Sequence, residues 1–468
     1  MSRRRRAAER RILQLLQDQK ARIFSNELLA HILRHHLHFS PSLLLFFNSL
    51  LKSQSLSPSS SRLSLPLFSL LHHLSLFPNH LTFPPLLKSL SNLRHLFSGQ
   101  AIHATTIISG FHSYPSISIA TLDLYSSCHH LHDARNVFDE MPHRDAVVWN
   151  ILINAFSKAG DLQNAYLFFR RADHRNTVTW NSIINGFAKA GKDEAAMDLF
   201  KEMWAAGIEL DDATLATVLP VCARLGAVHA GRLIHDHARR RGLLKDAVNN
   251  VHVLNSLIDM YCKCGDLVTA RKVFDEMPKR SVVSWNAMIN GLGSNGRVED
   301  GLELFETMMR SGFRPNAGTF LGVLGCCRHT GMVGKGREVF RVMAAEYGVE
   351  PEIEHYGCMV DLLGRCGFVR EGYELITRMT MKPSAAIWGA LLSSCRNYGD
   401  VEMAVVAAKE LVEVEPWNSG NYVLLSNVYA EAGRWEDVEK VRISMKEKCV
   451  KKAAPGQSLI GLSSSVGL

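Results

Sequence analysis

The sequence predicts an all-α protein, a right-handed superhelical solenoid of helix-turn-helix repeats. Three observations predict it: short strings recur along the chain, small residues recur at fixed places between them, and apolar residues follow helical spacing within each unit. A single helical hairpin cannot bury its apolar face alone, so we expect the units to stack into one continuous array.

The recurring strings set the repeat register. Val-x-Trp-Asn occurs at 147–150, 178–181 and 283–286, and Phe-Asp-Glu-Met-Pro occurs at 138–142 and 274–278. When each unit begins three residues before its aromatic residue, units begin at 80, 115, 146, 177, 212, 251, 282, 317, 353, 385 and 419. Position 15, which did not set this register, is glycine in nine of these eleven units: Gly160, Gly191, Gly226, Gly265, Gly296, Gly331, Gly367, Gly399 and Gly433.

The columns of this register describe a helical hairpin. About a dozen residues of helical period open each unit, and glycine at position 15 suits the left-handed conformation that ends a helix. A second helix follows, and we expect its small residue at position 20 to lie where the two helix backbones approach closely. That residue is alanine or glycine in ten units: Gly99, Ala134, Ala165, Ala196, Gly231, Ala270, Gly301, Gly336, Gly372 and Ala404.

The net charge of +8 is unevenly placed along the 468 residues. Residues 1–77 hold 11 of the 53 Lys and Arg and 3 of the 45 Asp and Glu, so residues 78–468 carry 42 of each sign. A strongly basic nucleic-acid-binding surface over the body is therefore excluded, although local basic grooves are not. The apolar stretches at 43–47 and 63–77 are too short and too polar to span a bilayer, so we expect no membrane association.

The cysteines indicate packing, not a disulfide framework or a metal site. Three fall at position 14 and three at position 11 of different units, so they are spaced along the array and do not converge on an ion. They are Cys128, Cys264 and Cys366 at position 14, and Cys222, Cys327 and Cys395 at position 11. No phosphate-binding loop or nucleophile elbow is present, and we expect no cofactor and no small-molecule substrate.

The strings and the unit lengths resemble pentatricopeptide repeats. Units 177–211 and 282–316 have 35 residues, units 115–145 and 251–281 have 31, and unit 317–352 has 36. This mixture is similar to the plant PLS class, and Gly-x-x-Ile-His at 99–103 and 231–235 resembles the signature of its long units. The small residue at position 20 is shared with tetratricopeptide repeats, so a peptide-binding scaffold is the less favoured alternative.

The C-terminal part resembles the E-type subgroup of that class, without a DYW deaminase domain. Residues 385–418 and those from 419 onward look like its paired extension motifs, and 455–460 resembles a degraded form of its closing string. We therefore expect an N-terminal region at 1–77, a repeat array at 80–384 whose units run from 31 to 39 residues, extension motifs at 385–460 and a short tail at 461–468.

The resemblance implies that each unit reads one RNA base through position 5 and its last residue. The implied pairs are Asn150 with Asn176, Asn181 with Asp211, Asn255 with Ser281, and Asn286 with Asn316, and the apolar flanks are Val147, Val178 and Val283. Asn181 with Asp211 implies uracil, Asn255 with Ser281 leans to cytosine, and the other two imply a pyrimidine. The alternative is that these polar residues are simply solvated or cap helices.

Other units depart from this reading pattern. Position 5 is Pro84, Ile119, Ala216, Leu321 or Gly357, and none of these can bond a base edge through its side chain. The resemblance implies that long units do not read a base, so Pro84, Ala216 and Leu321 are expected there. Ile119 and Gly357 lie in short units and are therefore the departures from the pattern. Unit 212–250 is about three residues too long, which indicates a loop insertion near 245–250.

The resemblance implies a specificity factor for C-to-U editing of single-stranded organellar RNA. A zinc deaminase needs His-x-Glu and Cys-x-x-Cys, and the chain contains neither, so we expect no enzyme activity and a deaminase-bearing pentatricopeptide repeat protein or other editing cofactors in trans. The alternative is a factor for stability, splicing or translation of an organellar transcript.

The first 77 residues indicate delivery to a plant organelle. Six arginines at positions 3–6, 10 and 11 precede a Leu-, Ser- and His-rich stretch with few acids, as in a transit peptide. Arginine enrichment favours the mitochondrion, with the chloroplast as the alternative. Degenerate repeats from about Glu27 onward are also expected, and a basic RNA-binding arm is the third interpretation.

Overall fold

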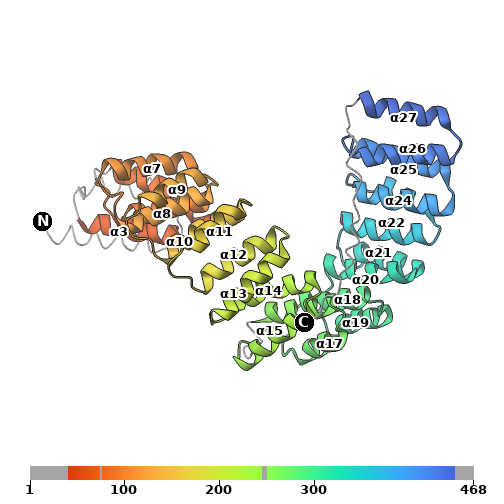
Figure 1. Ribbon diagram of the computed structural model, residues 1–468, viewed down its shortest axis with the longest axis horizontal. Coiled ribbons are helices and arrows are strands. Elements are labelled where there is room, and N and C mark those ends of the chain that lie inside the picture. The colour runs from red at the N-terminus through yellow and green to blue at the C-terminus, as the bar shows by residue number, and fades with distance from the viewer. Residues whose placement is uncertain (1–40, 74–75, 245–249, 448–468) are drawn as a thin grey trace, which may run out of the picture. The chain divides into compact units, whose positions relative to one another are not determined.

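The computed structural model describes residues 41–73, 76–244 and 250–447, and these form helices without any strand (Figure 1). The prediction of an all-α helical repeat solenoid is confirmed. The Arg-rich segment, the expected insertion at 245–249 and the closing string at 455–460 lie outside the described residues.

Each repeat contributes two helices. The first helices are α6 (Phe83–Leu93), α8 (Pro115–Ser127), α10 (Ala146–Lys158), α12 (Thr177–Lys189), α14 (Asp212–Leu225), α16 (Val251–Lys263), α18 (Val282–Ser294), α20 (Ala317–Thr330), α22 (Ile353–Arg365), α24 (Ala385–Tyr398) and α26 (Ser419–Glu431). The second helices are α7 (Leu96–Ile108), α9 (Leu131–Glu140), α11 (Leu162–Arg171), α13 (Asp193–Ala205), α15 (Val228–Arg240), α17 (Leu267–Glu276), α19 (Val298–Arg310), α21 (Val333–Ala345), α23 (Val369–Thr377), α25 (Val401–Val414) and α27 (Trp435–Glu447).

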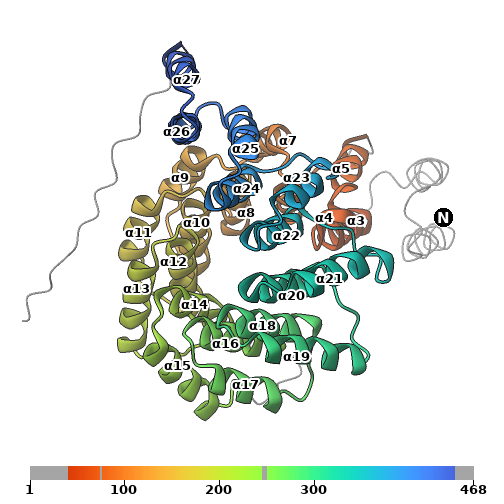
Figure 2. The same ribbon diagram turned by 90° about the vertical axis from the view of Figure 1, so that its right-hand side faces the viewer.

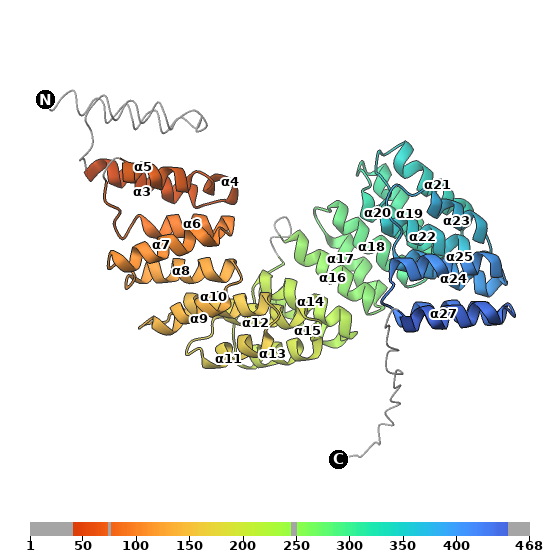
Figure 3. The same cartoon turned by 90° about the horizontal axis from the view of Figure 1, so that it is seen from above.

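The helices belong to two compact units, Met1–Val221 and Cys222–Leu468, which are described separately. In the first, α3 (Pro41–Gln54), α4 (Pro58–Ser61) and α5 (Ser64–His73) precede the array and pack against α6 (Figure 3). Phe47, Leu51 and Leu71 are fully buried there with Phe83. Helices therefore precede the repeat that begins at residue 80.

Successive first helices lie side by side, and so do successive hairpins. In the first unit α8, α10 and α12 form one row, with α9, α11 and α13 outside it; in the second, α16, α18 and α20 form the corresponding row (Figure 2). An aromatic residue at position 4 fills the space between hairpins. Trp149, Trp180 and Trp285 pack edge-on against the preceding unit's phenylalanine, with ring centroids 4.8, 4.7 and 5.0 Å apart.

The expected register is confirmed at its helix boundaries. The first helices begin at the predicted residue in ten units, from 115 to 419, and α6 begins at Phe83 instead of residue 80. Pro84 and Pro85 fall in the first turn of α6, the part of a helix that tolerates proline. All nine position-15 glycines adopt φ between 64° and 84°, the left-handed conformation that a Cβ disfavours.

The position-20 residue is placed differently from the prediction. A Cβ on Gly99, Gly231 or Gly336 would meet a side chain of the following unit's first helix, at 2.4 Å from Leu124, 2.5 Å from Met260 and 2.5 Å from Leu362. The small residue therefore meets first a side chain of the next hairpin, although a Cβ on Gly301 would also lie 3.6 Å from the Ile289 carbonyl oxygen of its own hairpin. The column thus serves stacking between units.

Long and short units differ mainly in their second helix. The 31-residue units have second helices of 10 residues in α9, α11 and α17. The 35-residue units have 13 residues in α13 and α19. The first helices α10, α12, α16 and α18 all have 13 residues, so the spacing between position 5 and the next unit changes on the second-helix side alone.

Candidate nucleic-acid interface

Three valines at position 2 are exposed despite their apolar side chains. Val147, Val178 and Val283 are 52%, 54% and 58% exposed. Each lies one turn before the position-5 asparagine of the same helix, because residues three apart share a helix face. The structure therefore places each predicted base-flanking valine one turn from the position-5 asparagine of its unit.

The last residue of each predicted reading unit caps the next unit's first helix. Backbone N–H groups donate to Asn176 at 3.0 Å, Asp211 at 2.7 Å, Ser281 at 3.3 Å and Asn316 at 3.1 Å. Capping was the alternative interpretation of these residues, and the structure shows it for the last position. Each cap uses one side-chain oxygen, so capping leaves the other atom of an amide or carboxylate available.

Two of the four predicted pairs are joined directly. Asn181 Nδ2 donates to Asp211 Oδ1 at 2.9 Å, and Asn286 Nδ2 donates to Asn316 Oδ1 at 3.0 Å. Neither Asn150 with Asn176 nor Asn255 with Ser281 is joined by a hydrogen bond within the described chain. Both direct pairs occur in 35-residue units, 177–211 and 282–316.

Several polar atoms at these positions have no partner. The amide oxygens of Asn150, Asn181 and Asn255 are buried and accept no hydrogen bond from the described residues. Asn286 differs, because its Oδ1 accepts the Thr319 hydroxyl at 2.7 Å. Buried polar atoms are normally paired, so three unpaired oxygens at one repeat position are a departure that recurs with the repeat.

Asp211 is held in its ionised form. Burial alone would raise the pKa of its carboxyl group, but hydrogen bonds from Thr214 and Asn181 outweigh burial and lower the pKa below the ordinary 3.8. The bonds from Asn181 Nδ2, Thr214 N and Thr214 Oγ1 all fall on Asp211 Oδ1, and Oδ2 has no partner in the described chain. An acceptor that cannot donate suits the ring N–H of uracil and opposes the bare ring nitrogen of cytosine.

Two sets of residues at this site were not predicted from the sequence. The first is the hydroxyl at position 3, where Thr179, Thr214 and Thr319 are fully buried and bond the preceding unit's last residue. The signal was the Asn-x-x-Thr or Asp-x-x-Thr spacing of a helix cap.

The second set is a column of exposed lysines at position 13. Lys158, Lys189 and Lys263 end their first helices and are exposed. Position 13 lies eleven residues after position 2, which is about 20° from it around a helix of 3.6 residues per turn. These cations therefore share the face of the exposed valines, and their common column was the signal.

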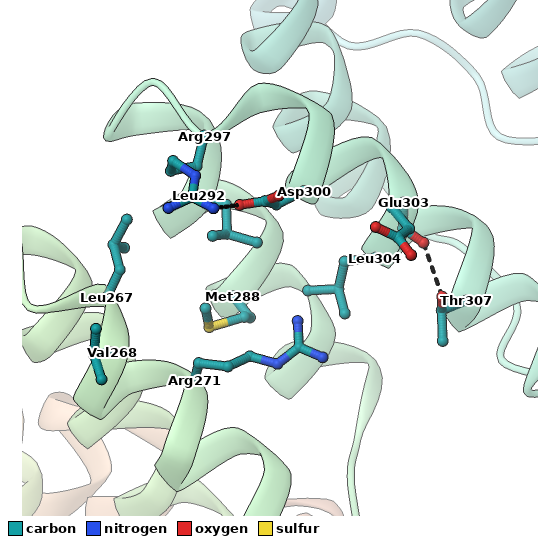
Figure 4. Close-up of a pocket in the computed structure, with 10 residues that line it drawn as sticks. All are labelled: Leu267, Val268, Arg271, Met288, Leu292, Arg297, Asp300, Glu303, Leu304 and Thr307. Atoms are coloured by element: carbon teal, nitrogen blue, oxygen red, sulfur yellow. Dashed lines mark hydrogen bonds and ion pairs between the residues drawn. The ribbon is translucent and has the colours of Figure 1, made fainter.

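The cavity drawn in Figure 4 is lined by residues of α17, α18 and α19. Arg271 and Val268 of α17 reach it from one side and α19 borders it on the other, with Met288 at its floor (Figure 4). Arg297 is paired with Asp300 at 2.6 Å. None of the sequence-predicted reading residues lines this cavity, so it does not belong to the interface.

The cysteines among the described residues are free thiols. Burial raises the pKa of the Cys222, Cys262, Cys326 and Cys395 thiols to about 12, which keeps them protonated. No group of three His, Cys, Asp or Glu side chains suited to a metal occurs among the described residues. Over the same residues, no helix combines the length and apolarity needed to cross a membrane.

The fold defines a helical-hairpin repeat protein, in which the last residues of four units cap the next helix. Family models agree with this class: a PPR repeat family model matches 175–224 and 280–329, PPR repeat models match 147–176, 245–278 and 354–383, and an E motif model matches 398–461.

Known relatives identify the family. The chain is 45% identical to the pentatricopeptide repeat-containing protein At1g09190 of Arabidopsis thaliana, over 97% of this chain and 98% of that one. It is 46% identical to At2g20540 of the same organism, over 83% of this chain and 72% of that one. The chain belongs to the pentatricopeptide repeat family, and its mixed unit lengths and E motif are those of the PLS class, E-type subgroup.

A solved structure shares the fold. The pentatricopeptide repeat protein PPR10, crystallised with an 18-nucleotide psaJ RNA element, superposes with a TM-score of 0.68 at 16% identity. The match covers 93% of this chain and spans 66% of the PPR10 chain.

Proposed function

We propose that this protein binds single-stranded RNA by sequence, one base per reading unit. The observation that carries the proposal is the recurrence of a half-buried asparagine at position 5 of four units, with its amide oxygen unpaired in three of them and an exposed valine one turn earlier in three. An isolated unpaired amide costs stability, and three equivalent ones are explained by a ligand that repeats at the same spacing. RNA has that periodicity, and the base supplies both a polar edge and an apolar face.

The side chains divide the contacts with one nucleotide. The position-5 asparagine and the free atom of the last residue face the base edge, and the position-2 valine packs on the base face. Lys158, Lys189 and Lys263 lie on the same helix face and supply cations for the phosphates. PPR10, which shares the fold, was crystallised with RNA.

Within RNA biology, we propose a specificity factor for C-to-U editing in a plant organelle. The E motif resembles the extension of editing-type members. The protein would supply recognition, and a deaminase acting in trans would supply the chemistry. Relatives include proteins named mitochondrial and chloroplastic, which supports an organelle, and the arginine-rich first residues favour the mitochondrion.

RNA binding is tested by selecting from a random single-stranded RNA pool with the full chain. We expect the wild type to enrich a pyrimidine-rich motif and the Asn181→Ala, Asp211→Ala double variant to lose its uracil. Unchanged enrichment by the double variant would overturn base reading.

Editing is tested by comparing organellar transcripts with and without the gene. We expect conversion to fall at one or a few cytidines while transcript levels hold. Transcripts that vanish or remain unspliced would instead support a role in stability or splicing.

A further inference from the structure

An arginine precedes the last residue of three short units and makes the same contacts each time. The Nε atoms of Arg144, Arg175 and Arg280 donate to the carbonyl oxygen six residues earlier, at 3.1, 2.9 and 3.0 Å. Their Nη2 atoms donate to the carbonyl five residues earlier, at 3.0, 2.7 and 3.0 Å. These carbonyls lie at the C-terminal end of the second helix, where a helix lacks partners for its last C=O groups.

Each guanidinium also lies against an aromatic ring. Its central carbon is 4.7 Å from the Phe138 centroid in the first junction, 5.0 Å from Phe169 in the second and 4.7 Å from Phe274 in the third. The same phenylalanine packs against the next unit's tryptophan, the residue directly before the position-5 asparagine. The arginine is therefore fixed by two hydrogen bonds and a cation–π contact.

The loop that carries the arginine has few other attachments. Ala172 N donates to Phe168 O at 3.1 Å, whereas the backbone amides of Asp173, His174 and Arg175 find no backbone acceptor in the described part of the chain. The residue after the arginine is the last residue of the unit, Asn176 in this junction, which caps the next helix. The arginine thus fixes the loop on one side of that residue and the cap fixes it on the other.

We propose that Arg175 and Arg280 are positioning residues for RNA recognition: they hold Asn176 and Ser281, the last residues of two short reading units, where they meet the base. Arg144 makes the same contacts in the unit of Ile119, which does not read a base. The inference rests on the proposed function. The role proposed for these arginines is to bind the protein's own carbonyl oxygens and not RNA phosphates, because their Nε and Nη2 atoms already donate within the chain.

The 35-residue units achieve the same result differently. The residue before Asp211 is Leu210, which is 7% exposed, and the residue before Asn316 is the buried Pro315. An apolar side chain anchored in the core replaces the arginine there. Presenting the last residue through an anchored neighbour is therefore common to both unit lengths, and the arginine is the solution of units with the shorter second helix.

The test compares Arg175→Gln with Arg171→Gln in the full chain. Arg171 is exposed at the end of the same helix and serves as the matched control. Selection from a random RNA pool gives the base preference at every nucleotide, and Asn150→Ala identifies the nucleotide read by that unit. We expect Arg175→Gln to lose at least tenfold of the preference at that nucleotide, to keep it elsewhere, and to leave the salt dependence of binding unchanged.

Hydrogen exchange without RNA provides the second readout. We expect the hydrogen-bonded amides on either side of the loop, Ala172 N on Phe168 O and Thr179 N on Asn176 Oδ1, to exchange at least tenfold faster in Arg175→Gln and at the wild-type rate in Arg171→Gln. Unchanged exchange, or an unchanged preference at that nucleotide, overturns the positioning role. A uniform loss of affinity with a salt slope reduced by about 1 would instead identify a phosphate contact. A wild-type protein that enriches no sequence overturns both this inference and the proposed function.

Discussion

Asp211→Asn isolates the charge of one reading side chain from its structural role. Asp211 Oδ1 accepts from Thr214 N and Oγ1, both at 2.7 Å, and from Asn181 Nδ2 at 2.9 Å. An asparagine oxygen can accept the same three bonds, and asparagine caps helices as well as aspartate does. The substitution therefore replaces only the free Oδ2, a charged acceptor, by an amide donor.

The expected loss follows from that one atom. A hydrogen bond to a charged group is worth about 1.5–3 kcal/mol and a neutral one about 0.5–1.5 kcal/mol. Because the new amide N–H cannot accept the ring N–H of uracil, the whole charged bond is lost, and binding to uracil should weaken by about 1.5–3 kcal/mol, or roughly 10- to 150-fold. The new N–H can meet the bare ring nitrogen of cytosine, so the preference for uracil over cytosine should largely disappear.

Fluorescence anisotropy with two RNAs that differ only in this base measures the effect. Asp161→Asn is the matched control, because Asp161 caps the second helix α11 with a 3.1 Å bond from Asn164 N. That control should retain the wild-type preference. An unchanged uracil-to-cytosine ratio in Asp211→Asn, with the control also unchanged, would refute the assignment of Oδ2 to the base.

The same assay gives a pH dependence. The hydrogen bonds from Thr214 and Asn181 lower the pKa of Asp211 despite its burial, so the carboxylate stays ionised above the ordinary value of 3.8. A group whose pKa is lowered by folding keeps its contribution at neutral pH and loses it only as the pH falls through the lowered value. The uracil preference should therefore be constant from pH 8 to pH 5. A decline within that range would contradict the lowered pKa.

Two further substitutions test packing and the valine flank. Gly291→Ala would place a Cβ 2.2 Å from the Cys262 sulfur, so we expect about 1–3 kcal/mol of destabilisation and a lower urea midpoint, whereas Gly389→Ala, with nothing within 4 Å, should not lower it. Val178→Ser should leave the urea midpoint unchanged, because the Val178 side chain is 54% exposed, but it should weaken RNA binding by about 1 kcal/mol. The control Val268→Ser on α17, where the valine is 84% exposed, should leave RNA binding unchanged. Equal midpoints for the two glycine variants, or equal affinities for the two valine variants, would contradict these expectations.

The positions of the helices could be predicted because the repeat constrains them many times over. A tryptophan such as Trp180 and a glycine such as Gly191 recur at fixed separations, and each has a local physical reason for its place. The start of α6 was wrong by three residues because that unit carries Pro84 and Pro85 where others carry good helix formers. Periodicity predicts well where the units are alike and poorly where a unit departs from the pattern.

The repeat positions that make up the site could be predicted from the sequence, but the hydrogen bonds between their side chains could not. Asn181 bonds Asp211 in a 35-residue unit, whereas Asn150 does not bond Asn176 in a 31-residue unit, and the repeat pattern alone did not show that unit length goes with the bond. That difference depends on where one hairpin lies against the next, which side-chain spacing within a unit does not report. The position-20 contacts were misplaced for the same reason, because Leu124 reaches Gly99 from the following hairpin.

The dual use of the last residue bears on how such a protein can change its target. Because that residue must cap the next helix, its choice is narrowed to Asn, Asp, Ser and Thr, the residues that cap well. The chain uses three of them, at Asn176, Asp211 and Ser281. Exchanges within this small alphabet alter the atom offered to a base while costing little folding stability, so new binding specificities can evolve one repeat at a time without weakening the array.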